Sequence, residues 1–219
     1  MKELIPANEY GIFADMKETA RANSLMVAKY FGKDHRKVTR DIESLDCSPE
    51  FNAANFGRIS YTDSRGRKQK AYAMTRDGFM FLVMGYRGKK AAALKELYIK
   101  RFNEMEKFIR ALAETREEFP LLTANIALIH DDPKPYHYSN EANMLNRLAI
   151  GMTAKEFRVL HGLKDGESIR PYLTPEQVDT LDTLQKIDTG LMLAMPDFNQ
   201  RKRQLQWYLD RTQRKITTA

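Results

Sequence analysis

Four basic side chains along one predicted helix are the residues of this chain best suited to a chemical role. The apolar residues of segment 34–45 recur at the spacing of one helical face. At about 100° per residue, the basic side chains fall on the opposite side: Lys33, Arg36, Lys37 and Arg40. Lysine and arginine bind phosphates, and arginine also reads guanine edges in the major groove. The pattern predicts contact with nucleic acid, with an ordinary solvated helix face as the alternative.

A second basic cluster lies on a predicted β-hairpin over residues 56–74. Asp63 and Gly66 bracket a four-residue loop that suits a type I turn, with Gly66 at positive φ. Basic residues gather at its tip: Arg65, Arg67 and Lys68. A helix-turn-helix followed by a basic hairpin is typical of a winged helix, whose wing lies along a DNA backbone or minor groove.

Residue types used in catalysis and metal binding are not arranged for either. The four histidines lack metal-ligand spacing, and no catalytic Cys/His signature surrounds Cys47. Segment 85–90 is rich in glycine and lysine, but it lacks the glycine spacing of a phosphate loop, so a turn between two helices is the preferred interpretation. We expect no enzyme activity, no bound metal and no cofactor.

Composition excludes two broad classes of protein. No apolar run approaches the roughly 20 residues that span a bilayer, and the N-terminus lacks a signal-peptide pattern. The single cysteine rules out an internal disulfide and favours a reducing, cytoplasmic compartment. The net charge of +7 is uneven, with +6 in residues 1–119 and +1 in residues 120–219. This asymmetry indicates two modules, of which the first meets an anionic partner.

The elements that position these residues indicate an α+β fold. We predict an N-terminal winged-helix-like domain with a β-hairpin wing, a long connecting amphipathic helix and a small all-α C-terminal domain. The basic helix follows a short helix that begins at Ser24 and ends at Gly32 as its C-cap. Thr75 is expected to cap a buried helix over residues 78–86. The boundaries are 1–23 for an N-terminal arm, 24–88 for the winged-helix-like domain, 89–115 for the long helix, 116–137 for a linker region and 138–219 for the helical domain. The first twenty residues show no clean period, so they are expected to form either a loose arm or an edge strand.

The long helix, expected to end near Ala113, carries an apolar stripe that a small domain is not expected to cover. Its members are Leu94, Tyr98, Phe102, Met105, Ile109 and Leu112. Leaving such side chains in water costs about 1.5–3 kcal/mol each. We therefore expect a homo-oligomer, either a dimer or a tetramer, because two-fold symmetry is commonest.

The C-terminal module has clear helix starts and little net charge. Thr153 and Thr174 each begin a capping box, and Asp197 can cap a final helix. That last helix carries an aromatic and arginine set suited to a protein interface: Arg201, Arg203, Trp207 and Tyr208. The alternative for Trp207 is that it closes the core of the domain.

A family resemblance rests on a long string of residues over about 24–108. The string includes Gly32-Lys33-Asp34-His35, Ser60-Tyr61-Thr62-Asp63-Ser64-Arg65-Gly66-Arg67-Lys68-Gln69, Thr75-Arg76-Asp77-Gly78-Phe79, Leu82-Val83-Met84-Gly85-Tyr86 and Phe102-Asn103-Glu104-Met105-Glu106. It resembles the Rha family of phage regulatory proteins. Residues 1–23 depart from that pattern.

The resemblance implies a regulator of temperate phages that acts in the bacterial host's cytoplasm. Members of the family are similar to antirepressors, which capture a phage repressor and so switch on lytic genes during prophage induction. The first hypothesis is therefore an antirepressor that binds a phage repressor protein. The second is a winged-helix transcription regulator that binds double-stranded DNA directly, which the basic helix and wing favour. The long amphipathic helix and the nearly neutral helical module favour the antirepressor, which is preferred mainly because of the resemblance.

Overall fold

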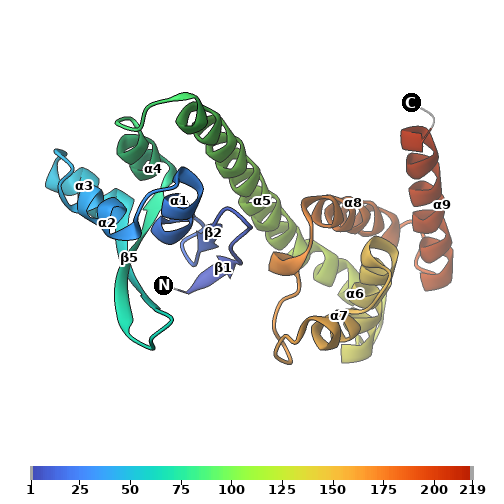
Figure 1. Cartoon of the computed structure of the whole chain (residues 1–219). Coiled ribbons are helices and arrows are strands. Elements are labelled where there is room, and N and C mark those ends of the chain that lie inside the picture. The colour runs from blue at the N-terminus through green and yellow to red at the C-terminus, as the bar shows by residue number, and fades with distance from the viewer. Residues whose placement is uncertain (1, 218–219) are drawn as a thin grey trace. The chain divides into compact units, whose positions relative to one another are not determined.

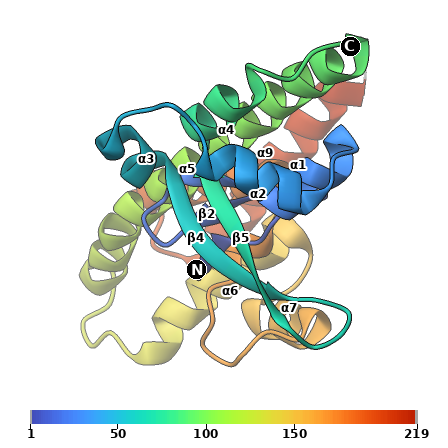
Figure 2. The same ribbon diagram turned by 60° about the vertical axis from the view of Figure 1, so that its left-hand side comes forward.

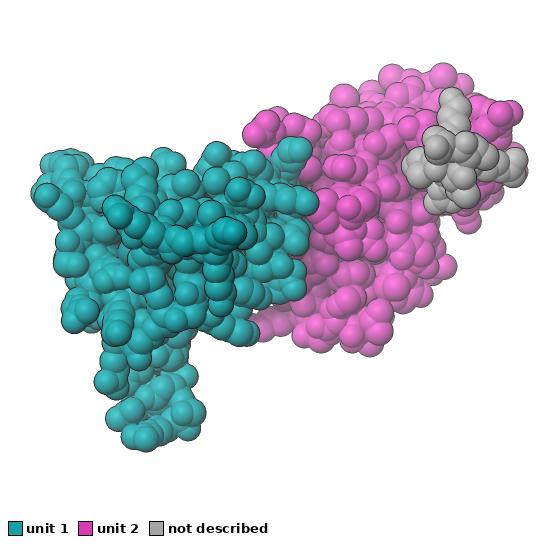
Figure 3. Space-filling model, turned by 45° about the horizontal axis from the view of Figure 1, so that its top comes forward, with its two compact units in different colours: residues 1–109 teal, residues 110–219 magenta. Residues whose placement is uncertain are grey.

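The computed structural model describes residues 2–217, with side chains through Thr212, and divides into two compact units. Unit 1 comprises residues 1–109 and unit 2 comprises residues 110–219 (Figure 3). Residue 1 of the predicted arm and residues 218–219 of the predicted helical domain lie outside the described part. Within that part, no helix is both long and apolar enough to cross a membrane.

Unit 1 is built on a five-stranded antiparallel sheet of order β1-β2-β3-β5-β4. The strands are β1 (Glu3–Ile5), β2 (Ile12–Asp15), β3 (Ala20–Asn23), β4 (Phe56–Thr62) and β5 (Lys68–Thr75). β4 and β5 form a long hairpin (Figure 2). β3 joins β5 in the middle of the sheet, with Ala22 opposite Met74.

Residues 3–23 contribute β1, β2 and β3 to the sheet, so this segment is not a loose arm, and β1 is the edge strand that the sequence left as the alternative. All four residues of β2 are buried, so no alternation of apolar and polar residues marks this strand in the sequence. The residue opposite Arg21 in β5 is Thr75, far along the chain, and no local pattern announces such a pairing.

Four short helices accompany the sheet (Figure 1). They are α1 (Ser24–Phe31), α2 (His35–Glu43), α3 (Pro49–Asn55) and α4 (Arg76–Val83). α1 and α4 pack against β3 and β5. Thr75 caps α4 as expected, because its Oγ1 accepts from the Gly78 N–H at 3.2 Å. α3 was not predicted from the sequence, although Ser48 caps it and Pro49 occupies its first position.

α5 (Lys89–Leu128) is a helix of 40 residues, and the boundary between the units falls within it. It runs through residues 116–128, which the sequence analysis assigned to a linker. The helix continues there because buried Leu122 and Ile126 extend its apolar face. The stabilisation from burying these side chains exceeds the cost of the backbone hydrogen bond that Pro120 cannot donate.

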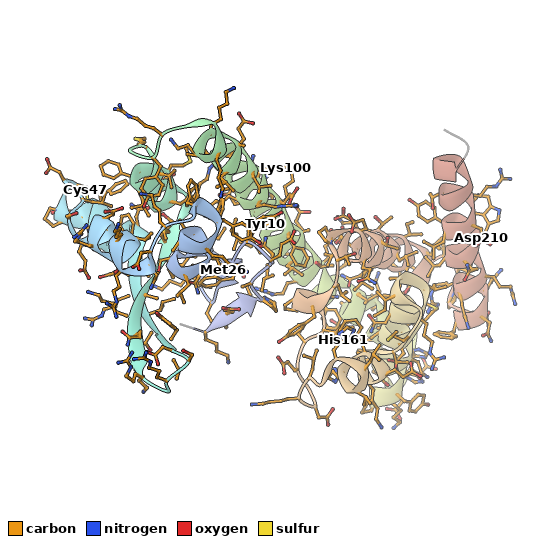
Figure 4. All side chains as sticks on the ribbon, viewed as in Figure 1. Tyr10, Met26, Cys47, Lys100, His161 and Asp210 are labelled. Carbon is orange, nitrogen blue, oxygen red and sulfur yellow. The ribbon has the colours of Figure 1, made fainter. Side chains whose placement is uncertain are left out.

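The apolar stripe of α5 is covered inside the chain. Tyr98, Phe102, Met105 and Leu112 are buried, while Leu94 and Ile109 are half-buried. In unit 1, Phe79 stacks on Tyr98 with ring centroids 4.5 Å apart. Tyr10, labelled in Figure 4, accepts a hydrogen bond from the Tyr98 hydroxyl at its carbonyl oxygen (3.0 Å). Tyr98, Phe102, Met105 and Leu112 are therefore not exposed to solvent. The exposed stripe that led to the predicted homo-oligomer is absent at these four described residues.

Unit 2 contains the end of α5 and four further α-helices in the described residues. These are α6 (Pro135–Ile150), α7 (Ala154–His161), α8 (Pro175–Met192) and α9 (Phe198–Thr217), with a short 3-10 helix η1 (Arg170–Tyr172). Both predicted capping boxes are present, at Thr153 and Thr174. Asp197 accepts from the Gln200 N–H at 2.7 Å, as expected for the start of the last helix.

Candidate nucleic-acid interface

α2 separates an apolar face from a basic one. Gly32 ends α1 in the left-handed conformation at φ 63°, and Asp34 caps α2 by accepting from the Arg36 N–H at 2.7 Å. The buried residues of α2 are Val38, Thr39 and Ile42. Its exposed residues include the three predicted basic side chains Arg36, Lys37 and Arg40. α2 therefore has the buried apolar side and the exposed basic residues that the sequence predicted.

The acidic side chains of α2 are engaged within unit 1. Asp41 accepts from the Tyr86 hydroxyl at 3.2 Å, and burial together with this carboxylate raises the pKa of Tyr86. Glu43 pairs with Lys70 of β5 and accepts from the Tyr72 hydroxyl at 2.7 Å. The hydrogen bond from Lys70 is the main cause that lowers the pKa of Glu43. Both acids therefore have partners within unit 1.

Arg36, Lys37 and Arg40 differ from these acids because they form no ion pair within the described residues. Lys33 is an exception in the predicted basic set. It is half-buried, and its Nζ lies 3.9 Å from the centroid of the Tyr86 ring. Three of the four predicted positions thus form an exposed positive face on α2.

A buried serine fastens both helices to the hairpin. Ser24 Oγ, on α1, accepts from the Tyr72 N–H of β5 at 2.9 Å and lies 3.0 Å from His35 Nε2 of α2. The His35 ring also meets Tyr61 of β4 edge to face, with centroids 5.5 Å apart. These contacts hold α2 against both strands of the hairpin.

The hairpin tip is organised around one carboxylate. Asp63 Oδ1 accepts from the backbone N–H groups of Arg65 and Arg67, both at 2.9 Å. Asp63 Oδ2 accepts from Arg67 Nε at 3.0 Å and Gln69 Nε2 at 3.1 Å. These bonds lower the pKa of Asp63, with the Arg67 N–H as the largest contribution. Gly66 adopts φ 75°, as the turn prediction required.

Arg65, Arg67 and Lys68 are exposed at this tip, and of the three only Arg67 has an ion-pair partner among the described residues. The hairpin projects from unit 1 (Figures 1 and 3). Together with α2, it presents two exposed basic segments on elements that are linked to each other. This arrangement is suited to the phosphates of a nucleic acid.

The predicted partner-binding set on α9 is split by the structure. Arg201 is fully buried, so it is not the surface anchor that the sequence suggested. Its guanidinium pairs with Asp188 of α8 at 3.0 Å and with Glu141 of α6. Burial is the main cause that raises the pKa of Glu141 to about 7, and it also raises that of Asp188.

The remaining residues of that set are accessible. Arg203 is exposed and Tyr208 is half-buried. Trp207 is 53% exposed, with the Arg211 guanidinium 5.5 Å from its ring centroid, so it does not close the core.

In the described residues, no group of three or more His, Cys, Asp or Glu side chains could hold a metal ion. His130 and His137 stack with ring centroids 3.7 Å apart. Residues 85–88 form the turn between α4 and α5, with Gly88 at φ 101°.

Residues 22–107 match the family model of the phage regulatory protein Rha. Over these residues the chain is similar to the Rha family. The matched segment contains α1, α2, the β4–β5 hairpin and the first part of α5. β1 and β2 precede the matched residues, although they complete the sheet of unit 1. Both exposed basic segments therefore lie within the residues that match this family model.

Two curated relatives share part of the sequence. An uncharacterized protein of Haemophilus influenzae is 46% identical over 93 residues, which cover 41% of this chain and 53% of that protein. An uncharacterized 22.8 kDa protein of Salmonella phage P22 is 36% identical over 124 residues, which cover 53% of this chain and 61% of that protein. The chain thus spans between half and two thirds of the length of these relatives.

The residues that position α2 were missed by sequence reasoning. Ser24 and Tyr72 are 48 residues apart, and Glu43 and Tyr72 are 29 apart. No local spacing rule covers such separations. Ser24 carried a signal for the start of α1, yet nothing in the sequence indicated that its hydroxyl bonds to a strand.

Proposed function

We propose that this chain is a phage-type transcription regulator that binds double-stranded DNA through α2 and the β4–β5 hairpin, in the manner of a winged helix. The observation that carries the proposal is the charge arrangement on α2. Arg36, Lys37 and Arg40 are exposed without an acidic partner in the described residues, whereas Asp41 and Glu43 are both engaged within unit 1.

The basic side chains of α2 and its contacts with the hairpin suit a recognition helix. An α-helix enters the major groove, where lysine and arginine contact phosphates and arginine also binds guanine edges. The contacts of Ser24, His35 and Glu43 fix α2 relative to the hairpin, so less conformational freedom is lost on binding. Arg65 and Lys68 at the hairpin tip then contact the backbone beside the groove.

A binding assay with a charge-matched control tests this proposal. Fluorescence anisotropy with duplex DNA is expected to show strong binding by the wild type and weak binding by R36A/K37A/R40A. The control K155A/K202A/R203A removes three exposed basic residues of unit 2 that form no ion pair within the described residues. Equal losses in the two triple variants would overturn the role of α2.

Capture of a phage repressor, with relief of lytic-gene repression, is the second candidate function. It is supported by the resemblance to antirepressors and by exposed apolar side chains on unit 2. Val159 and Leu160 of α7 and Trp207 of α9 are each more than half exposed. Large exposed aromatic and aliphatic side chains are typical of protein interfaces.

Size-exclusion chromatography with a helix-turn-helix phage repressor separates the two candidates. An antirepressor forms a complex with the repressor in the absence of operator DNA and removes it from that DNA. Operator binding typically lies at about 10⁻⁸–10⁻¹¹ M, so capture requires a nanomolar or tighter complex. Co-elution that W207A abolishes would favour capture, and DNA binding by the chain alone would favour the direct regulator.

A further inference from the structure

Unit 2 has a cavity of about 230 Å³, partly open to solvent, that the proposed DNA-binding surface does not use. Residues of α5, α6, α7 and α8 line it, together with the segment that leads into η1. Part of the wall is apolar and consists of the buried side chains Leu122, Leu145, Ile169 and Leu181. Such a wall suits the body of a small organic molecule.

Two arginines line the same cavity. Arg158 of α7 donates from Nη1 to the Glu167 carbonyl oxygen at 3.1 Å. Its Nε is buried and donates no hydrogen bond in the described residues, and its one printed ion-pair contact, with exposed Asp165, is long at 3.8 Å. A buried charged donor without an acceptor is costly. An anion in the cavity would supply the missing acceptor.

Arg170 presents a second guanidinium that no carboxylate holds at hydrogen-bond distance in the described residues. Its Nη2 donates to Gln185 Oε1 at 3.0 Å, and its Nη1 lies 3.5 Å from the Thr115 carbonyl oxygen. Both hydrogen-bond partners are neutral, and the Asp182 carboxylate acts on the guanidinium through its charge without a hydrogen bond in the described residues. Arginine held in this way binds a carboxylate through two parallel hydrogen bonds.

The acid among the described lining residues, Glu167, is already engaged. Its carboxylate accepts from the Tyr172 hydroxyl at 2.7 Å and from the Lys164 N–H at 3.1 Å. The cavity therefore combines an apolar wall with two arginines and an acid that has other partners. Its volume lies between the roughly 150 Å³ that holds benzene and the roughly 300 Å³ at which drug-sized sites begin.

We infer that this cavity is a binding site for a compact organic monocarboxylate of about the size of benzoate. The carboxylate takes hydrogen bonds from Arg158 and Arg170, and the apolar body lies against the leucine and isoleucine side chains. The site is independent of the α2 and hairpin surface, so its failure would leave the proposed DNA binding untouched.

Calorimetry on the full chain at constant ionic strength tests the inference with three probes. Benzoate is expected to bind with a dissociation constant of about 1 mM or tighter. Benzamide has the same shape without the charge, and inorganic phosphate has charge without the apolar body. Both are expected to bind at least about tenfold more weakly than benzoate, which corresponds to about 1.4 kcal/mol.

Variants then assign the binding to the two arginines. R158Q is expected to weaken benzoate binding about tenfold or more, whereas R203Q, which changes an exposed arginine of the same unit, leaves it unchanged. Circular dichroism checks that R158Q is folded, and the contrast between benzoate and benzamide needs no variant. No benzoate binding, equal binding of benzamide or phosphate, or an unaffected folded R158Q would each overturn the site.

Discussion

α2 in unit 1 and α9 in unit 2 use arginine in opposite ways. On α2, Arg36 and Arg40 are exposed while the acids of the helix are engaged elsewhere in unit 1. On α9, Arg201 is fully buried between Asp188 and Glu141. The sequence shows arginines on a helix in both cases. The position of the acids therefore decides whether an arginine is exposed or is buried in an ion pair.

The largest expected effect comes from breaking the buried cluster in unit 2. Arg201→Ala leaves two carboxylates buried without their cation, and the loss of one partner from a buried pair costs about 3–5 kcal/mol. Urea unfolding followed by circular dichroism measures this loss. Arg203→Ala, two residues along the same helix but exposed, is the control and should change stability little. A small effect of Arg201→Ala would mean that the cluster does not hold α9.

The same cluster makes stability depend on pH. The pKa of Glu141 is raised from 4.5 to about 7 by burial, so the folded protein holds this proton more tightly than the unfolded chain. Its contribution is fully present below about pH 4.5 and is lost as pH rises to about 7. The expected size is about 1–3 kcal/mol.

The measurement is the difference in unfolding free energy between wild type and Glu141→Gln across this pH range. The two proteins must be compared because the lowered pKa values of His35 and His130 make the unfolding free energy rise with pH below about 6.5. This effect is opposite in sign to that of Glu141. Parallel curves for the two proteins would show that Glu141 does not take up the proton.

In unit 1, the buried link between α1, α2 and β5 should give the next effect. Ser24→Ala removes the acceptor of the Tyr72 N–H, and an unsatisfied buried donor costs about 1–3 kcal/mol. Ser60→Ala, on the exposed side of β4, is the matched control. Thermal unfolding of the two variants checks the difference, and equal midpoints would contradict the role of the Ser24 hydroxyl.

The smallest expected effect compares two glycines, one in each unit. Gly66 and Gly166 both have φ near 75° and open space around the position of a Cβ. Alanine in the left-handed region costs roughly 1–2 kcal/mol, so Gly66→Ala and Gly166→Ala should destabilise the protein similarly. DNA affinity, measured by anisotropy, should fall in Gly66→Ala alone because Gly66 shapes the hairpin tip. A loss of DNA affinity in both variants would remove the distinction between the units.

Local signals made part of this structure predictable. Gly32, Thr153 and Thr174 mark helix ends through backbone geometry and capping, and each prediction was confirmed. The basic face of α2 was predictable because the apolar period fixes which side faces the core. The match of residues 22–107 to the Rha family also confirmed the resemblance.

The rest depended on contacts between distant residues. Strand β2 is buried throughout and shows no alternation, and its sheet closes through β3 pairing with β5. The burial of Arg201 requires Glu141, 60 residues earlier, which no spacing rule connects to it. The continuation of α5 past Pro120 follows from burial of Leu122 and Ile126, not from propensity.

The central claim is that the basic face of α2 contacts DNA phosphates, and the salt dependence of DNA binding tests it most directly. Each phosphate contact contributes about −0.9 to the slope of log K against log salt concentration. R36A/K37A/R40A should therefore flatten the wild-type slope by roughly 2.7, whereas K155A/K202A/R203A should leave it unchanged. A wild-type slope retained in the α2 variant would contradict the account and make these side chains an ordinary solvated surface.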